Sequence, residues 1–334
     1  MGKHKHPFSN MSRMMNEMTA KISSEVRAGL SLPSEWNTQV SALRSYNSKD
    51  CCHVKKITYH VAPHLRSTDV QIFLIHDIFE HHMRWYPLVE RLVQEWSGNY
   101  QLVLHDLKGH GMSTGTRAHI EDFSIYCKDL ATLINLCKES RSEKCRVIVI
   151  GQGIGGLVIL KAIEQYRHLI DAVIGGIILI NPSFKLAFQT PCSLPVTLRN
   201  FSSVLSNISS KIRFARPFSG HDLFAITKDA EDYNADPLIP RFLSLGLMSQ
   251  LLKSTKEIRQ FSYFVDVPSL FLCGKPGPLF DPDSAFLFHK GIPNTDSLYL
   301  QYPEEKHGLL YGEKKQEIIV TIKNWIQKIA DNVT

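Results

Sequence analysis

Apolar residues follow two alternating patterns along most of the chain. Short continuous apolar runs occupy residues 69–75, 145–150 and 172–180. After the first two runs, a turn leads into a stretch in which apolar residues recur at helical spacing. Strands buried on both faces of a parallel sheet have such continuous runs. Alternation of strand and helix predicts an α/β fold with a mostly parallel central sheet and helices on both faces.

The pattern predicts seven strands and five main helices. The predicted strands are 53–61, 69–75, 101–106, 145–150, 172–180, 267–274 and 296–302. The predicted helices are 83–96, 120–138, 155–166, 282–289 and 313–330. From about 183 to 262 the periodicity is irregular and interrupted by prolines, which predicts a helical cap inserted between two late strands.

The first part of the chain has a different pattern. Methionines at positions 11, 14, 15 and 18 continue into Ile22 and Val26 at helical spacing. We therefore expect an N-terminal helical extension over 1–45 and a main domain over 46–334. The methionine stripe fits a helix packed on its own domain, and it also fits a surface for a protein partner or a membrane.

Composition and charge narrow the functional classes. Lysine plus arginine number 38 against 32 aspartate plus glutamate, a net charge of +6 without a run of like charges, so no nucleic-acid partner is expected. Seven irregularly spaced cysteines without zinc-ligand spacing indicate reduced thiols, and neither a metal nor a cofactor is expected. The polar N-terminus and the lack of an 18-residue apolar run predict a cytoplasmic protein, with peripheral membrane association left open.

A glycine-rich turn carries the most specific chemical signal. The segment CRVIVIGQGIGG (145–156) is a buried strand that runs through glycines into a helix. The α/β-hydrolases have the sequence G-x-S-x-G at such an elbow, with the nucleophilic serine in a strained backbone conformation. Here Gly151 and Gly155 are the outer glycines and Gly153 stands at the centre. A dinucleotide-binding loop is disfavoured, because the next strand ends at Ile180 without a following acidic residue.

A second segment, LIHDIFEHHMRW (74–85), resembles the HGxxEH motif of lipases of this fold. His76, Glu80 and His81 match that motif, whereas Asp77 and Phe79 replace its glycines.

Two further segments extend the resemblance. HDLKGHGMSTG (105–115) is similar to D-x-x-G-H-G-x-S-x-G, and TKDAEDYNADPL (227–238) is similar to a cap segment that ends in D-P-L. From roughly 55 to 330 the chain therefore resembles monoacylglycerol lipase-like α/β-hydrolases of the serine aminopeptidase S33 (Hydrolase_4) family. The resemblance implies an α/β-hydrolase fold and a lipid or acyl ligand.

The resemblance also implies positions for the catalytic groups. Gly153 stands at the nucleophile position, Gly277 at the acid position, and His307 is the retained histidine. Asp281 matches a second acid of the family pattern and is the candidate substitute acid. The oxyanion-hole amides would be those at positions 78 and 154, both isoleucine (Ile78 and Ile154).

Two functions follow as hypotheses. Loss of the serine of a triad lowers turnover by about 10⁶, so the first hypothesis is a pseudohydrolase that binds a lipid-like ligand or a protein partner. The alternative is a divergent lipid ester hydrolase, similar to an esterase or lysophospholipase, that uses His307 with Asp281.

Overall fold

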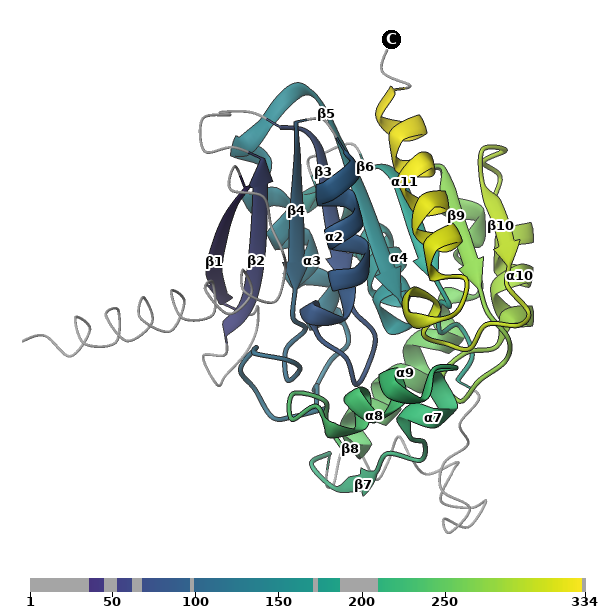
Figure 1. The fold of residues 1–334 in the computed structure, drawn as a ribbon. Helices are drawn as coiled ribbons and strands as arrows, with labels where there is room; N and C mark the ends of the chain where they lie inside the picture. Colours follow the sequence, from purple (N-terminus) through teal and green to yellow (C-terminus); the bar gives the residue numbers. More distant parts are fainter. Residues whose placement is uncertain are drawn as a thin grey trace, which may run out of the picture.

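An eight-stranded sheet forms the centre of the molecule (Figure 1). The structure, a computed structural model, describes residues 36–44, 53–61, 68–96, 99–170, 174–186 and 210–331. The strand order is β1-β2-β4-β3-β5-β6-β9-β10. The pairs β1–β2 and β2–β4 are antiparallel, and all pairs from β4 to β10 are parallel.

The strands of this sheet are β1 (Trp36–Arg44), β2 (His53–Val61), β3 (Thr68–Ile75), β4 (Tyr100–His105), β5 (Arg141–Gln152), β6 (Ile174–Ile180), β9 (Ser269–Cys273) and β10 (Leu298–Gln301). The main helices around it are α2 (Tyr86–Glu95), α3 (Ser124–Leu136), α4 (Ile154–Tyr166), α10 (Pro282–Lys290) and α11 (Lys315–Asp331). Short 3-10 helices are η1 (His82–Trp85), η2 (Lys138–Ser140), η3 (Arg167–Leu169), η4 (Ser262–Phe264) and η5 (Leu309–Tyr311).

Successive residues of the parallel strands pack into two different cores. In β3, Ile72 and Leu74 join the cluster beneath α2 and α11, whereas Phe73 and Ile75 join the cluster beneath α3 and α4. Side chains alternate between the faces of a strand, so a strand covered on both faces must be apolar throughout. This arrangement explains the continuous apolar runs and confirms the predicted fold class, a mostly parallel sheet with helices on both faces.

A small cap lies beside one end of the sheet (Figure 1). It contains β7 (Arg213–Ala215), α7 (Gly220–Leu223), α8 (Thr227–Ala235), β8 (Phe242–Ser244) and α9 (Leu245–Ile258). Hydrogen bonds and an ion pair tie it to loops of the core. The amide of Gly308 donates to the carbonyl of Leu223 at 2.9 Å, and His81 Nε2 lies 2.8 Å from the Asp236 carboxylate in the D-P-L segment.

Strand β1 corrects one expectation. It forms at Trp36–Arg44, inside the stretch predicted as a helical extension, and pairs with β2 along its whole length. The methionine stripe before it favoured a helix, whereas the strand depends on pairing with β2, which no local pattern shows. The stripe itself lies outside the described residues, and the division at residue 45 remains a prediction that β1 argues against.

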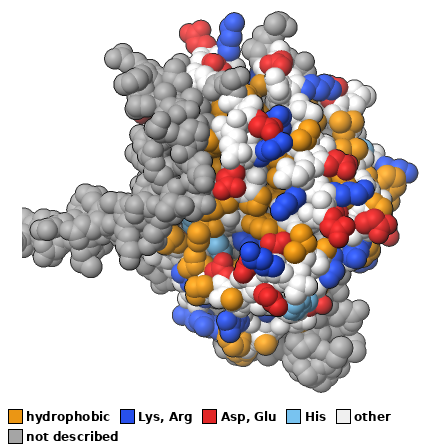
Figure 2. Space-filling view, viewed as in Figure 1, with side chains coloured by type: hydrophobic (Ala, Val, Ile, Leu, Met, Phe, Trp, Pro, Cys, Tyr) orange, Lys and Arg blue, Asp and Glu red, His pale blue; other side chains and the backbone are white. Residues whose placement is uncertain are grey.

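The face that carries α2 and α11 mixes charges of both signs (Figure 2). Glu95 of α2 pairs with Arg91 at 2.6 Å and with Lys323 of α11 at 2.8 Å. Within the described part of the chain no helix is long and apolar enough to cross a membrane. Cys127, Cys145 and Cys273 there are free thiols.

Candidate active site

The glycine-rich turn has the backbone of a nucleophile elbow. Strand β5 ends at Gln152, Gly153 has φ 54° and ψ −117°, and α4 begins at Ile154. Residues with a side chain rarely adopt this φ, whereas glycine adopts it at little cost. Gly155 is required for a different reason, because a Cβ there would overlap the carbonyl of Ile75 and push α4 away from β3.

The carboxylate of Asp77 occupies the centre of the site. Its Oδ1 accepts hydrogen bonds from the amides of Ile78 and Ile154, each at 2.7 Å. Its Oδ2 lies 2.7 Å from His307 Nε2. Asp77 is completely buried, and His307 is almost so. One side chain therefore binds both amides expected to form the oxyanion hole and also the retained histidine.

The position of Asp77 depends on the absence of a side chain at residue 153. A Cβ built on Gly153 would overlap the carboxyl carbon and both carboxylate oxygens of Asp77. A serine at the elbow and the observed Asp77 conformation therefore exclude each other. The glycine at residue 153 and the aspartate at residue 77 form one structural unit.

Asn181 fixes the backbone of His307 at the carboxyl edge of the sheet. His307 follows β10, and its carbonyl accepts a hydrogen bond from Asn181 Nδ2 at 2.7 Å, just after β6. The Asn181 oxygen accepts from the amide of Gly274 at 2.7 Å, so this residue links three loops. Within the described residues, His307 Nδ1 has no hydrogen-bond partner, although it is buried.

The loop expected to supply the catalytic acid is open at Gly277. This glycine pairs with Phe280 in a tight turn, and a Cβ built on it meets no atom within 4 Å. Asp281 has other partners: its Oδ2 accepts from Lys185 Nζ at 2.7 Å, and its Oδ1 caps α10 through the amide of Asp283 at 3.1 Å. Asp281 therefore stabilises the start of α10 and pairs with Lys185, and these contacts do not involve Asp77 or His307.

A second buried carboxyl, Glu80, lies near the same pair. Burial raises the pKa of Glu80 to about 7, and the charge of Asp77 adds to this rise while Arg84 and His307 oppose it. The side-chain amide Nε2 of Gln152 donates to Glu80 Oε1 at 3.3 Å. Glu80 therefore changes protonation near neutral pH, unlike an ordinary glutamate.

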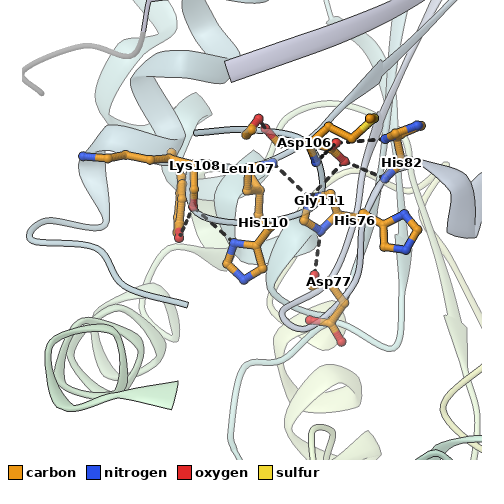
Figure 3. A network of polar contacts seen from close by, with 12 residues as sticks. His76, Asp77, His82, Asp106, Leu107, Lys108, His110 and Gly111 are labelled. Carbon is orange, nitrogen blue, oxygen red and sulfur yellow. Dashed lines mark hydrogen bonds and ion pairs between the residues drawn. The ribbon is translucent and has the colours of Figure 1, made fainter. Parts of the chain in front are cut away.

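A polar network behind the site fixes the backbone of residue 77 (Figure 3). His76 Nδ1 lies 2.7 Å from the carbonyl of Asp77, and its Nε2 accepts from the amide of Leu107 at 2.9 Å. This pair of contacts requires the proton on Nδ1, and burial lowers the pKa of His76 well below its usual value, so the ring is neutral.

Asp106 holds the other side of this network. Its carboxylate accepts from the amide of His82 at 2.7 Å and from the amide of Met112 at 2.8 Å, and it lies 2.9 Å from His82 Nδ1. Burial would raise the pKa of Asp106, but the neighbouring histidines, His82 foremost and then His76 and His81, together lower the pKa below the usual range. The loops that follow β3 and β4 are thereby joined beneath the site.

The sheet order, the elbow and the placement of His307 after the last strand define an α/β-hydrolase. A family model described as "Serine aminopeptidase, S33" (Hydrolase_4) matches residues 66–315, and the chain belongs to this family.

Individual relatives agree with this assignment. The chain is 26% identical over 295 residues to the monoglyceride lipase of Rattus norvegicus, covering 81% of this chain and 92% of the relative. It is 24% identical over 252 residues to phospholipase YtpA of Bacillus subtilis, covering 74% and 91%. A soluble variant of Saccharomyces cerevisiae monoglyceride lipase, solved in complex with a substrate analog, has the same fold, with a TM-score of 0.69 at 17% identity over 86% of this chain and 96% of that one.

The HGxxEH motif assigns no role to Asp77, which stands in the place of one of its glycines. The signal was available, since a charged side chain directly before the expected amide donor at residue 78 has only a short distance to reach it. What the sequence could not show is that this carboxylate also reaches Ile154 and His307, which come from distant segments.

Proposed function

We propose that this chain is a member of the family that binds a lipid-like ligand and does not hydrolyse esters by the serine mechanism. The observation that carries the proposal is the Asp77 carboxylate, which accepts hydrogen bonds from the amides of Ile78 and Ile154 and contacts His307. Gly153 beside it has no hydroxyl group.

The chemistry of ester hydrolysis explains why this arrangement matters. A serine hydrolase needs a hydroxyl that attacks, a histidine that accepts its proton, and amide donors for the developing oxyanion. Asp77 occupies both the amides and His307 Nε2, so an ester carbonyl and a serine would each compete with a buried negative charge. The carboxylate of a bound acid product would make the same contacts in an active relative.

A lipid-like ligand is supported by the relatives and by the aromatic residues between cap and core. The rat relative is a monoglyceride lipase, and the yeast structure contains a substrate analog. Phe79, Phe218, Phe224 and Tyr233 are buried where the cap meets the core, so this boundary is apolar, as the lining of a lipid site is. A protein partner or a membrane surface at the N-terminal methionine stripe remains part of the hypothesis.

The direct test measures ester hydrolysis and probe labelling by the purified full-length chain. We expect turnover of monooleoylglycerol and of p-nitrophenyl butyrate to equal that of a His307→Ala variant, and we expect no labelling by a fluorophosphonate. Turnover that depends on His307, or a labelled serine, would disprove the proposal.

The alternative, a divergent lipid ester hydrolase that uses His307 with Asp281, is favoured by the lipases among the relatives. It requires Asp281 to leave Lys185 and the start of α10. Under this alternative, Asp281→Asn would lower turnover as strongly as His307→Ala does. Under the proposed function neither variant changes a background rate.

A further inference from the structure

Two arginines where the cap meets the core have guanidinium nitrogens without a partner. Arg84 lies in η1, and Arg216 follows β7 in the cap. Arg84 Nε and Nη2, Arg216 Nη1 and the hydroxyl of Tyr233 are all buried and have no hydrogen-bond partner among the described residues. Leaving a buried donor unpaired is unfavourable, and more so for a charged group, so such a group in a folded protein calls for an explanation.

Aromatic rings hold both arginines by their faces. The Arg84 guanidinium carbon lies 4.0 Å from the ring centre of Tyr311, 4.9 Å from that of Phe224 and 5.7 Å from that of Tyr233. The Arg216 carbon lies 4.8 Å from the Tyr233 ring centre. Tyr233 is therefore shared, and the two positive groups lie around one buried ring.

Arg216 has two further ring contacts and donates two hydrogen bonds. Its guanidinium carbon lies 5.4 Å from the Phe218 ring centre and 5.9 Å from that of Phe79. Its Nε donates to the carbonyl of Phe218 at 2.9 Å, and its Nη2 donates to Asn234 at 3.5 Å. Cation–π contacts stabilise the charge through the ring faces, and they leave the remaining N–H groups unused.

The unpaired guanidinium N–H groups indicate which kind of ligand would bind here. A guanidinium only donates hydrogen bonds, and its fork fits the paired oxygens of a carboxylate or phosphate. Two carboxyl groups, those of Glu80 and Asp236, act on Arg84 through space. The buried N–H groups of both arginines that have no partner among the described residues are therefore available to an acceptor on a ligand.

We propose that Arg84 and Arg216 together bind the oxyanion headgroup, a carboxylate or a phosphate, of a ligand with an apolar chain. Phe79, Phe218 and Phe224 contact the adjoining apolar part. The ligand is thus an anionic amphiphile and not a neutral monoacylglycerol. This inference rests on the proposed binding function and names the ligand class for it.

The test compares ligands that differ in the headgroup and contain no carboxylic ester bond. The probes are oleate, 1-O-octadecenyl glycerol and 1-O-octadecenyl glycerol 3-phosphate, below their micellar concentrations, titrated calorimetrically into the full-length chain. We expect at least one anion to bind roughly tenfold or more tightly than the neutral ether, the effect of one good charge-assisted contact. Which anion binds more tightly distinguishes a carboxylate ligand from a phosphate ligand.

Substitutions assign the preference to the two arginines. Arg216→Gln and Arg84→Gln should each lower anion affinity roughly tenfold and leave the affinity for the neutral ether unchanged. Arg216→Lys, which keeps the charge but loses the fork, should recover part of the affinity. Arg213→Gln removes an exposed arginine from β7 of the same cap and is the matched control, with no expected change.

The outcomes separate this inference from the proposed function. If neither oleate nor the phosphate binds more tightly than the neutral ether, or if anion binding is unaffected by both substitutions, the anion site is overturned. If Arg84→Gln fails to fold, the two Arg216 variants provide the test. Because no probe has a carboxylic ester bond, ester hydrolysis by the chain would disprove the proposed function without altering these measurements.

Discussion

The two glycines at the expected catalytic positions have opposite surroundings. The space in front of Gly153 is filled by the Asp77 carboxylate, whereas the space in front of Gly277 is empty to 4 Å. The two positions therefore differ in structure. At the elbow the Asp77 carboxylate lies where a side chain of residue 153 would be and accepts a hydrogen bond from the amide of Ile154, whereas at residue 277 no atom occupies the corresponding space. Placing a side chain at residue 153 and placing one at residue 277 should consequently have very different effects on activity and stability.

The largest effect is expected when all three changed positions are reverted together. Gly153→Ser alone should not produce an esterase, because a side chain at residue 153 overlaps Asp77. The triple variant Asp77→Gly, Gly153→Ser, Gly277→Asp frees both amides and provides the nucleophile and the acid. We expect its kcat/KM for p-nitrophenyl butyrate to exceed that of the wild type by about 10³-fold or more.

Two controls accompany this gain of activity. Adding His307→Ala to the triple variant should return the rate to background. The double variant Gly153→Ser, Gly277→Asp, which retains Asp77, should stay near background. If the double variant matches the triple variant, Asp77 does not block the site.

The next effect is on stability at the elbow. Gly153→Ala places a Cβ in the left-handed region and against Asp77, and should lower the free energy of unfolding by about 3 kcal/mol. In the Asp77→Gly background the overlap is removed, and the cost should fall to about 1–2 kcal/mol. Urea unfolding of the four proteins gives the coupling as a double-mutant cycle. Equal costs in both backgrounds would show that the two residues act independently.

A smaller effect concerns pH and Glu80. Its folded-state pKa, about 7, lies above the value of 4.5 for an ordinary glutamate. The folded state therefore retains a proton that the unfolded state releases, so the contribution to stability is full below pH 4.5 and is lost as the pH rises through 7. Relative to Glu80→Gln, the wild type should lose roughly 2–3 kcal/mol of unfolding free energy between pH 4.5 and 7.5. Parallel stability–pH curves for the two proteins would contradict this.

The smallest effect is expected at Gly277. Its φ lies outside the left-handed region and its Cβ position is open. Gly277→Ala should therefore stabilise the protein by about 0.5 kcal/mol, because it reduces the entropy of the unfolded chain. Thermal unfolding of Gly277→Ala and of Gly153→Ala, each compared with the wild type, measures the difference between the two positions. A loss above about 1 kcal/mol at residue 277 would mean that the loop is tighter than its geometry indicates.

The sequence predicted the parts of this molecule that depend on local pattern. Apolar runs such as 145–150 identify buried parallel strands because both faces are covered, and the glycines of the elbow identify a tight turn before α4. Strand β1 was missed because its partner β2 supplies the pairing, which no local pattern shows. Asp77 was missed for the same reason, since its role arises from three loops that only the folded sheet brings together.

In a working hydrolase the oxyanion amides must remain available until a substrate arrives. Here Asp77 accepts a hydrogen bond from the amide of Ile154, 77 residues away, and contacts His307, 230 residues away, so it connects the loops after β3, β5 and β10. Such a connection is formed only after long stretches of chain have come together. The three loops beneath the cap are therefore cross-linked through one buried side chain.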